Sequence, residues 1–157
     1  MEKTNVMRVL DQKKIPYTPH SYDPGAADGR SVAALTGTDP RKVFKTLVTV
    51  GASGQHYVFV VPVERELDLK KAAKAVGEKS VAMLRQAQLL PLTGYVHGGC
   101  SPIGMKKQFK TVIDGSARAL SAMLVSAGRI GAQVELAPAD LAALVRAAFA
   151  DVSSDTP

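Results

Sequence analysis

Residues 44–63 read FKTLVTVGASGQHYVFVVPV, and this stretch decides the fold class. Two runs rich in β-branched and aromatic residues, 44–50 and 57–63, flank the pentapeptide GASGQ at 51–55. Such runs favour strands, and a short connection with two glycines favours a turn between them. We therefore predict a β-hairpin at this place in the chain.

Short helical and extended segments alternate on both sides of the hairpin. Thr4 and Asp68 are predicted N-caps, each followed by apolar residues at helical spacing, and Gly77 is the predicted end of the second helix. We expect an extended segment at 17–22, short helices at 31–35 and 85–90, a turn after Asp39-Pro40, strands at 80–83, 111–113, 122–126 and 133–136, and a helix from Pro138 to about Phe149. The predicted class is α/β (α+β), with a curved, mixed, mainly antiparallel and barrel-like sheet surrounded by short helices.

The length and composition predict one domain. The chain has 157 residues, of which 46% are hydrophobic and 22% charged, which is ordinary for a globular protein. We expect a single domain over residues 1–151 and a flexible polar tail over 152–157. A single cysteine rules out an intrachain disulfide, and no apolar run reaches transmembrane length. These features predict a cytoplasmic protein without a membrane partner.

A Gly-rich stretch, TGYVHGGCSPIGMKK at 93–107, is the most unusual local sequence. Its four glycines and one proline between Gly94 and Gly104 exclude a helix interior or a central strand. Such a loop leaves bare N–H groups that a negative or polar ligand can approach closely. The alternative is a packed surface turn that binds nothing.

Lys45 lies in the first strand of the predicted hairpin. Alternate residues of a strand share a face, so Lys45 lies with Leu47 and opposite Thr46. A lysine in a run otherwise suited to burial either extends to solvent or directs a cation into a pocket. A cation beside bare backbone N–H groups suits a developing oxyanion or a phosphate.

The other candidate groups are weaker. Cys100 is a possible nucleophile with His97 as the only nearby base, but no helix N-terminus precedes it to lower its pKa, so a loop residue without a chemical role is the alternative. Ser101 lacks the Gly-x-Ser-x-Gly motif of hydrolases. Ser126 is either a pocket hydroxyl or a turn residue. The three histidines are too scattered for a metal site, and we expect neither a metal nor another cofactor.

The net charge of +6 favours acidic partners, of which nucleic acid is the commonest. Lys106, Lys107 and Lys110 form the densest basic cluster, directly after the Gly-rich loop. Aromatic residues are few, which argues against stacking along a single strand. We therefore expect these lysines to contact phosphates near a nucleic-acid end.

Several segments resemble the YbaK/EbsC family, the free-standing relatives of the editing domain inserted in bacterial prolyl-tRNA synthetases. The resemblance covers residues 11–152. Its motifs are KTL at 45–47, LDLKKAAK at 67–74, the Gly-rich stretch at 93–107, VS at 125–126 and VEL at 134–136.

The resemblance implies a deacylase that cleaves the ester of mischarged tRNA, chiefly cysteinyl-tRNA(Pro). By this resemblance, Lys45 is the key cationic residue of the pocket. The backbone of one loop shapes the aminoacyl site, and this loop consists of Gly98, Gly99, Cys100, Ser101 and Pro102. Tyr22, Thr46 and Ser126 match other pocket positions. Family members specific for cysteine use the substrate's own thiol to attack the ester, which requires no protein nucleophile or metal.

Two departures from the family pattern bear on amino-acid selectivity. Residues 26–30 contain no aromatic side chain, and Gln133 stands where close relatives often have a small or acidic residue. The open alternatives are an alanyl-tRNA(Pro) deacylase that uses an activated water and a non-catalytic tRNA-binding accessory of prolyl-tRNA synthetase. Prolyl-tRNA synthetase is the expected protein partner, the tRNA 3′ end is the expected substrate, and no DNA partner is expected.

Overall fold

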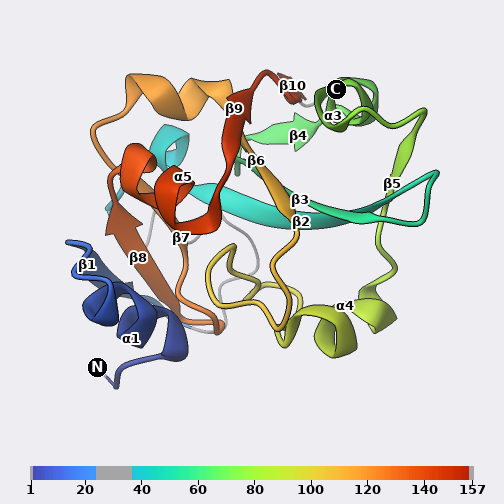
Figure 1. The fold of residues 1–157 in the computed structure, drawn as a ribbon. Helices are drawn as coiled ribbons and strands as arrows, with labels where there is room; N and C mark the ends of the chain where they lie inside the picture. Colours follow the sequence, from blue (N-terminus) through green and yellow to red (C-terminus); the bar gives the residue numbers. More distant parts are fainter. Residues whose placement is uncertain (1, 24–36, 156–157) are drawn as a thin grey trace.

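The computed structural model describes residues 2–23 and 37–155, and it confirms both the mixed α/β class and the central hairpin (Figure 1). Strands β2 (Phe44–Gly51) and β3 (His56–Pro62) pair antiparallel, in a register that runs from Phe44 opposite Pro62 to Val50 opposite His56. They form the middle of a five-stranded sheet with the order β5-β2-β3-β6-β9. The other three strands are β5 (Val81–Met83), β6 (Lys110–Asp114) and β9 (Ala148–Ala150).

Two smaller sheets accompany the large one. One has the order β1-β8-β7, with β1 at Thr18–Ser21, β8 at Ala132–Leu136 and β7 at Met123–Ser126. The other pairs β10 (Ser153–Asp155) with β4 (Arg65–Leu67). The predicted barrel-like closure is not confirmed, because the described strands form three separate sheets. An isolated parallel bridge between Val43 and Leu124 joins the large sheet to β7.

The hairpin separates two hydrophobic clusters, as its alternating side chains require. Phe44, Val48, Val58 and Val60 belong to the larger cluster, which also includes residues of β7, β8 and the first helix. On the opposite face, Phe59 and its neighbours pack with α3 and Val152. The strand that carries Lys45 is therefore held from both sides.

Helix ends follow the predicted capping residues. Helix α1 (Asn5–Gln12) begins after Thr4, whose hydroxyl accepts from the Met7 amide at 3.2 Å. Helix α3 (Leu69–Val76) begins after Asp68, which caps two amides, and ends at Gly77 in the left-handed conformation. Figure 1 shows α1 beside β1 and β8, far from α3 at the other end of the molecule.

Two helix ends differ from the expectation. Helix α4 (Gln86–Thr93) was expected to end before Pro91, but it continues for two residues beyond the proline. In its last turn, the Thr93 hydroxyl donates a hydrogen bond to the Leu89 carbonyl at 2.7 Å. Helix α5 (Pro138–Val145) ends before Arg146, which adopts a positive φ of 57°. Residues 148–150 then form strand β9, so a helix as far as Phe149 is wrong.

The prediction of a flexible tail is wrong for residues 152–155. Val152 and Ser153 are buried, and the Val152 amide donates to the Asp114 carboxylate at 3.1 Å. Strand β10 pairs with β4, so the polar residues that suggested disorder have backbone partners. The expected helix at 31–35 and the region 26–30 lie outside the described residues. Among the residues described, no helix is long and apolar enough to cross a bilayer.

Candidate functional site

A cavity of about 230 Å³ lies beside an open stretch of β2. In β2, the backbone N–H and C=O groups of odd-numbered residues point toward β3. Two hydrogen bonds at the ends of the hairpin show this: the Val63 amide donates to the Val43 carbonyl, and the Gly51 amide donates to the Gln55 carbonyl. Thr46 therefore directs its N–H and C=O toward the other edge, where β5 covers only Thr49–Gly51. The cavity thus has on one side main-chain groups of a strand edge that we call uncovered, because no described strand pairs with it at Thr46, and the sequence analysis missed this feature.

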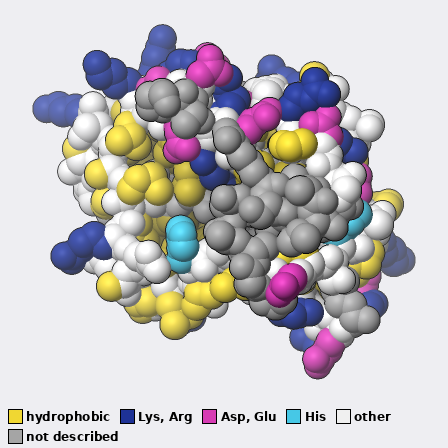
Figure 2. Space-filling view, turned by 180° about the vertical axis from the view of Figure 1, so that it is seen from behind, with side chains coloured by type: hydrophobic (Ala, Val, Ile, Leu, Met, Phe, Trp, Pro, Cys, Tyr) yellow, Lys and Arg dark blue, Asp and Glu magenta, His cyan; other side chains and the backbone are white. Residues whose placement is uncertain are grey.

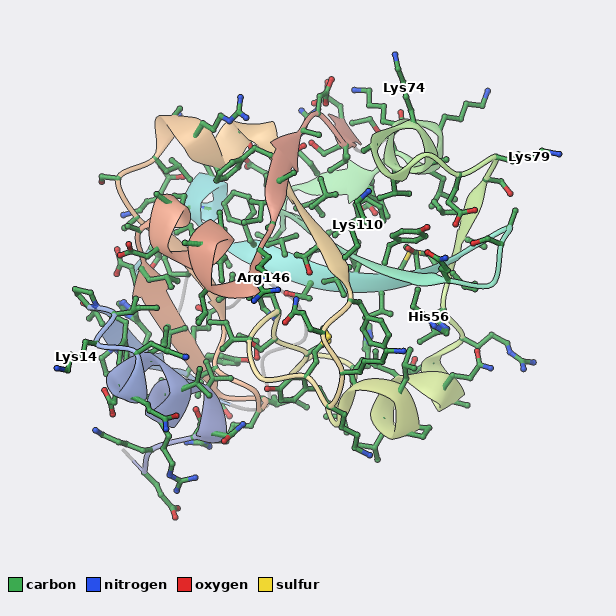
Figure 3. The ribbon with its side chains drawn as sticks, in the orientation of Figure 1. Lys14, His56, Lys74, Lys79, Lys110 and Arg146 are labelled. Atoms are coloured by element: carbon green, nitrogen blue, oxygen red, sulfur yellow. The ribbon has the colours of Figure 1, made fainter. Side chains whose placement is uncertain are left out.

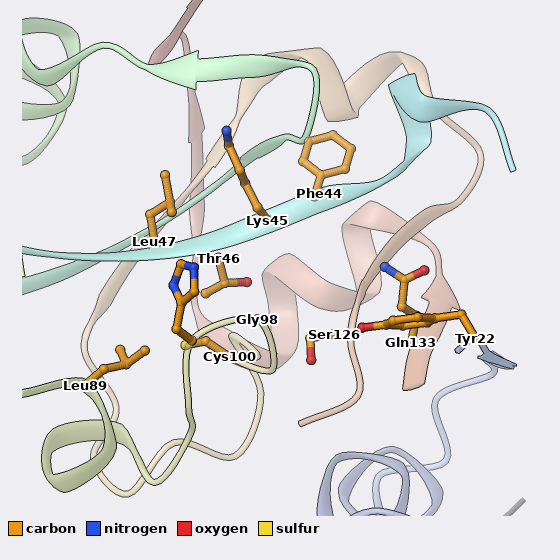
Figure 4. Close-up of a pocket in the computed structure, with 11 residues that line it drawn as sticks. Tyr22, Phe44, Lys45, Thr46, Leu47, Leu89, Gly98, Cys100, Ser126 and Gln133 are labelled. Carbon is orange, nitrogen blue, oxygen red and sulfur yellow. The ribbon is translucent and has the colours of Figure 1, made fainter. Parts of the chain in front are cut away.

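The first wall of the cavity, which we call the strand wall, consists of residues 44–47 of β2. The Lys45 side chain is 28% exposed, and its amine lies 3.5 Å from the Glu66 carboxylate of β4. Figure 4 shows this amine pointing to the opposite side of the strand from Thr46 and Cys100. Lys45 therefore lines the rim of the cavity, but its amine lies on the other face of β2, where a long, partly exposed ion pair of low strength restrains it.

The second wall, which we call the loop wall, consists of residues 97–100 of the Gly-rich loop. His97, Gly98 and Cys100 line the cavity, and Gly98 has a positive φ of 86° that favours glycine. Gly99 lies behind them, and a Cβ there would come within 3.1 Å of the backbone of Arg129 and Ile130. The loop is thus pressed against the turn after β7.

Hydrogen bonds hold the loop wall in place. The Ser126 hydroxyl donates to the Gly99 carbonyl at 3.0 Å and accepts from the Gly128 amide at 3.1 Å. The buried Tyr95 hydroxyl donates to the Ile103 carbonyl at 2.5 Å. The Gly99 amide donates to Val96, so this N–H is already used within the loop. Ser126 lines the cavity, but its hydroxyl serves to position the loop.

The environment of Cys100 opposes a role as nucleophile. Its side chain is 8% exposed, and burial raises the pKa of its thiol to about 12. A thiol of this pKa is almost entirely protonated at neutral pH, and the thiolate is the reactive form. Ser101 is fully buried, and its hydroxyl accepts from the Ile103 amide at 3.3 Å. Neither residue is placed to attack an ester.

The third wall consists of Tyr22, directly after β1, and Gln133 of β8. Figure 4 shows the Gln133 carboxamide above the Tyr22 ring, whose hydroxyl points toward Ser126. Within the described part of the chain, two buried side-chain atoms have no hydrogen-bond partner, and both belong to residues that line this cavity. They are Thr46 Oγ1 and Gln133 Oε1.

The structure brings six of the expected site residues together around one cavity. They are Tyr22, Lys45, Thr46, Gly98, Cys100 and Ser126. Gly99, Ser101 and Pro102 lie behind the lining and support it. Leu89 and Phe44 also line the cavity, and their apolar character gave no functional signal in the sequence. No carboxylate is among the lining residues that the structure describes.

The three expected phosphate-binding lysines do not line this cavity. The Lys106 amine lies 3.5 Å from the Pro91 carbonyl, and the Lys107 amine lies 6.0 Å above the Phe109 ring. Lys110 begins β6 and pairs with Tyr57 two strands from the cavity edge (Figure 3). On the face shown in Figure 2, the visible Lys and Arg side chains are spread around the periphery of the molecule and are not gathered at one place.

Comparison with known proteins places the chain in a family. The aminoacyl-tRNA editing domain model matches residues 23–144, which include all three walls of the cavity except Tyr22. The chain therefore belongs to the aminoacyl-tRNA editing domain family, and it is an aminoacyl-tRNA deacylase.

Two curated relatives match the chain in sequence. The chain is 46% identical over 155 residues to the "Putative Cys-tRNA(Pro)/Cys-tRNA(Cys) deacylase EbsC" of Enterococcus faecalis, covering 98% of this chain and 94% of that protein. It is 28% identical over 98 residues to the proline–tRNA ligase of Fervidobacterium nodosum, covering 62% of this chain and 17% of the ligase.

The solved structures show the fold. A crystal structure described as a putative trans-editing enzyme for prolyl tRNA synthetase has a TM-score of 0.84 at 24% identity, covering 98% of this chain and 99% of that one. A hypothetical protein has a TM-score of 0.88 at 24% identity, covering 96% and 100%. The arrangement of sheets and helices is therefore shared over almost the whole length of each chain.

Proposed function

We propose that the protein is a trans-editing deacylase that cleaves the ester of mischarged cysteinyl-tRNA(Pro). The observation that carries the proposal is the cavity itself, whose described lining includes Lys45, residues of the uncovered edge of β2, and a Cys100 thiol that burial keeps protonated. Its volume of about 230 Å³ is below the usual range of about 300–1,000 Å³ for ligand pockets, so it suits a single small amino acid. The 46% identical relative named for cysteinyl-tRNA supports the choice of substrate.

The residues of the cavity take different parts in this proposal. The aminoacyl group lies between the strand wall and the loop wall, with Thr46 and the amides of Gly98 and Cys100 as polar partners. Lys45 at the rim binds the ester end and its adjacent phosphate, after leaving Glu66. Ser126, Gly99, Ser101 and Pro102 keep the loop wall in shape, and Tyr22 closes the far end.

The chemical step uses the substrate's own sulfur. The deprotonated thiol of the cysteinyl group attacks the ester carbonyl carbon and forms a C–S bond. The bond from this carbon to the ribose oxygen breaks, and the ribose oxygen takes up a proton. The products are a cyclic thioester of cysteine and tRNA with a free terminal hydroxyl. The neutral Cys100 thiol takes no part.

The tRNA body is bound weakly in this proposal. Lys106, Lys107 and Lys110 contact phosphates outside the cavity, and each contact with a single strand contributes about −0.7 to the log–log salt slope. Because none of these three lysines lines the cavity, we infer that tRNA selectivity comes from a partner, prolyl-tRNA synthetase, in the cytoplasm. A binding constant that does not change with salt would contradict the assignment of the three lysines.

The test compares cysteinyl and seryl esters on one tRNA(Pro). The two substrates differ by sulfur and oxygen, so thiol attack predicts rapid cleavage of the cysteinyl ester alone. Alanyl- and prolyl-tRNA(Pro) complete the panel. Equal rates for cysteinyl and seryl esters would contradict thiol attack, and background rates for all four with enzyme in excess would contradict the deacylase activity on tRNA(Pro).

A second candidate is an alanyl-tRNA(Pro) deacylase that uses an activated water. It is favoured by His97, a base that lines the cavity next to apolar Leu89. The same panel separates the two, because water attack predicts that alanyl-tRNA(Pro) is cleaved and that His97→Ala abolishes its cleavage.

A further inference from the structure

Gln133 is a buried polar side chain that the proposed mechanism does not yet use. It is 6% exposed and lines the cavity, and its Oε1 atom has no hydrogen-bond partner among the described residues. A buried polar atom without a partner destabilises the folded protein unless something else compensates. Because the residue lines a cavity, a bound ligand is a candidate source of the missing donor.

Its neighbours on the sheet cannot supply this donor. Gln133 is central in its sheet, with His20 opposite it on β1 and Ser126 opposite it on β7. The His20 ring lies 2.8 Å from the Glu135 carboxylate, and the Ser126 hydroxyl donates to Gly99. Both cross-strand neighbours are thus engaged elsewhere. Neither of them supplies the donor, and a ligand bound in the cavity is the remaining source that we consider.

We propose that Gln133 Oε1 accepts a hydrogen bond from the α-ammonium group of the bound aminoacyl ester. This inference rests on the proposed function and names the part of the substrate that this residue recognises. The ester oxygens are acceptors, whereas the α-ammonium is the strong donor that every aminoacyl ester carries. No carboxylate of the described lining competes for it. Gln133 is then a specificity-determining residue for esters with a free α-amine.

The experiment removes the donor from the substrate and the acceptor from the protein in turn. Wild-type protein and Gln133→Met are compared on cysteinyl-tRNA(Pro) and on 3-mercaptopropionyl-tRNA(Pro), which keeps the thiol and lacks the amine. Because a hydrogen bond to a charged group is expected to change affinity by about 10- to 100-fold, wild type should prefer the cysteinyl ester by about that factor in kcat/KM. In Gln133→Met this preference should be smaller than in wild type by about that factor, mainly through a higher KM for the cysteinyl ester, while the intrinsic difference in ester reactivity remains.

Two further variants make the result specific. Gln133→Glu has the same shape and keeps an acceptor oxygen in either protonation state, so it should retain the preference for cysteinyl-tRNA. Gln12→Met changes an exposed glutamine on α1 and should behave as wild type. A thermal melt of each variant shows whether it is folded.

The outcomes separate this inference from the proposed function. If wild type cleaves the cysteinyl ester but Gln133→Met keeps the full preference for it, the inference is wrong and the proposed function stands. If wild type cleaves both esters equally, Gln133 does not recognise the amine. If wild type cleaves neither ester, the proposed function itself is wrong.

Discussion

The strand wall and the loop wall face the same cavity but differ in what they offer to a substrate. The strand wall carries a cation that is 28% exposed and an uncovered stretch of backbone. The loop wall is formed by His97, two glycines and a cysteine that is 8% exposed, and burial raises the pKa of the cysteine thiol to about 12. The charged group of the strand wall is thus partly accessible, whereas the thiol of the loop wall is buried and uncharged at neutral pH.

This difference shows that residue type alone does not identify the reactive group. A cysteine and a histidine in one Gly-rich loop suggest nucleophilic catalysis. A lysine in an apolar strand suggests only that its amine extends into solvent and has no chemical role. The surroundings reverse this ranking. The thiol is kept protonated by burial, and the amine is partly exposed and restrained, among the described residues, by one weak ion pair with Glu66.

The largest effect is expected from the charge of the strand wall. Lys45→Ala removes the rim cation, and the loss of one group that stabilises developing negative charge typically costs about 10²–10³ in rate. We expect a loss of this size in kcat/KM for cysteinyl-tRNA(Pro), measured by release of free tRNA. The thermal midpoint should change little, because the amine forms only one long ion pair.

Two matched lysine variants sharpen this test. Lys45→Arg keeps the charge and should retain a large part of the activity. Lys74→Ala removes an equivalent charge from the exposed face of α3, far from the cavity, and should leave the rate unchanged. Equal losses for Lys45→Ala and Lys74→Ala would mean that net charge matters and that the position at the rim does not.

The second effect concerns the packing of the loop wall. In Gly99→Ala, the new Cβ lies within 3.1 Å of the backbone of Arg129 and Ile130, so the loop has to move. Overpacking of this kind costs about 1–3 kcal/mol in unfolding free energy, and we expect a parallel loss of activity. Gly115→Ala is the control, since its Cβ would lie 3.7 Å from the nearest atom. Denaturant unfolding of both variants gives the measurement, and equal stability would contradict the close approach.

The sequence was sufficient for elements that depend on short-range contacts, whereas the roles of the candidate site residues stay predictions. The hairpin and the helix caps at Thr4 and Asp68 depend on neighbouring residues, and they were predicted correctly. The uncovered edge of β2 depends on where β5 stops pairing, and the buried tail depends on Asp114 and β4. These are contacts between distant parts of the chain, and composition does not contain them.

The pocket shows the same division. Lys45 and the Gly-rich loop were expected, because a lysine in an apolar strand and clustered glycines are unusual locally. The burial of Cys100 and the unpaired oxygen of Gln133 arise from packing among three strands and a loop. A pattern along the chain therefore identifies candidate residues, but it does not give the protonation or the hydrogen-bond state of their side chains.

The third effect tests the link between β7 and the loop wall. Ser126→Ala removes the hydroxyl that connects Gly99 to Gly128, and each neutral hydrogen bond contributes about 0.5–1.5 kcal/mol to stability. We expect a loss of unfolding free energy in this range and a decrease in activity of about threefold to tenfold, since a bond of this strength corresponds to such a factor. Ser126→Thr retains the hydroxyl and should be closer to wild type. A loss as large as that of Lys45→Ala would instead indicate direct contact with the reacting ester.

The smallest effect is expected for the thiol of the loop wall. Cys100→Ala should leave kcat/KM within about threefold of wild type, because a small substitution outside the chemistry usually has a minor effect.

The raised pKa of the Cys100 thiol, about 12, explains why this residue is not a nucleophile, and it can be tested by a second measurement, the rate of alkylation. At pH 8 a thiol of this pKa is about 10⁻⁴ ionised, against about 10⁻¹ for an ordinary thiol of pKa 9.0, so alkylation by iodoacetamide should be about 10³-fold slower in the folded protein than in denaturant. Because the pKa is raised, the rate for the folded protein should continue to increase with pH beyond 9, up to the pH at which the protein unfolds. Rapid alkylation at pH 7 together with an inactive Cys100→Ala variant would transfer the nucleophilic role from the substrate to the loop wall.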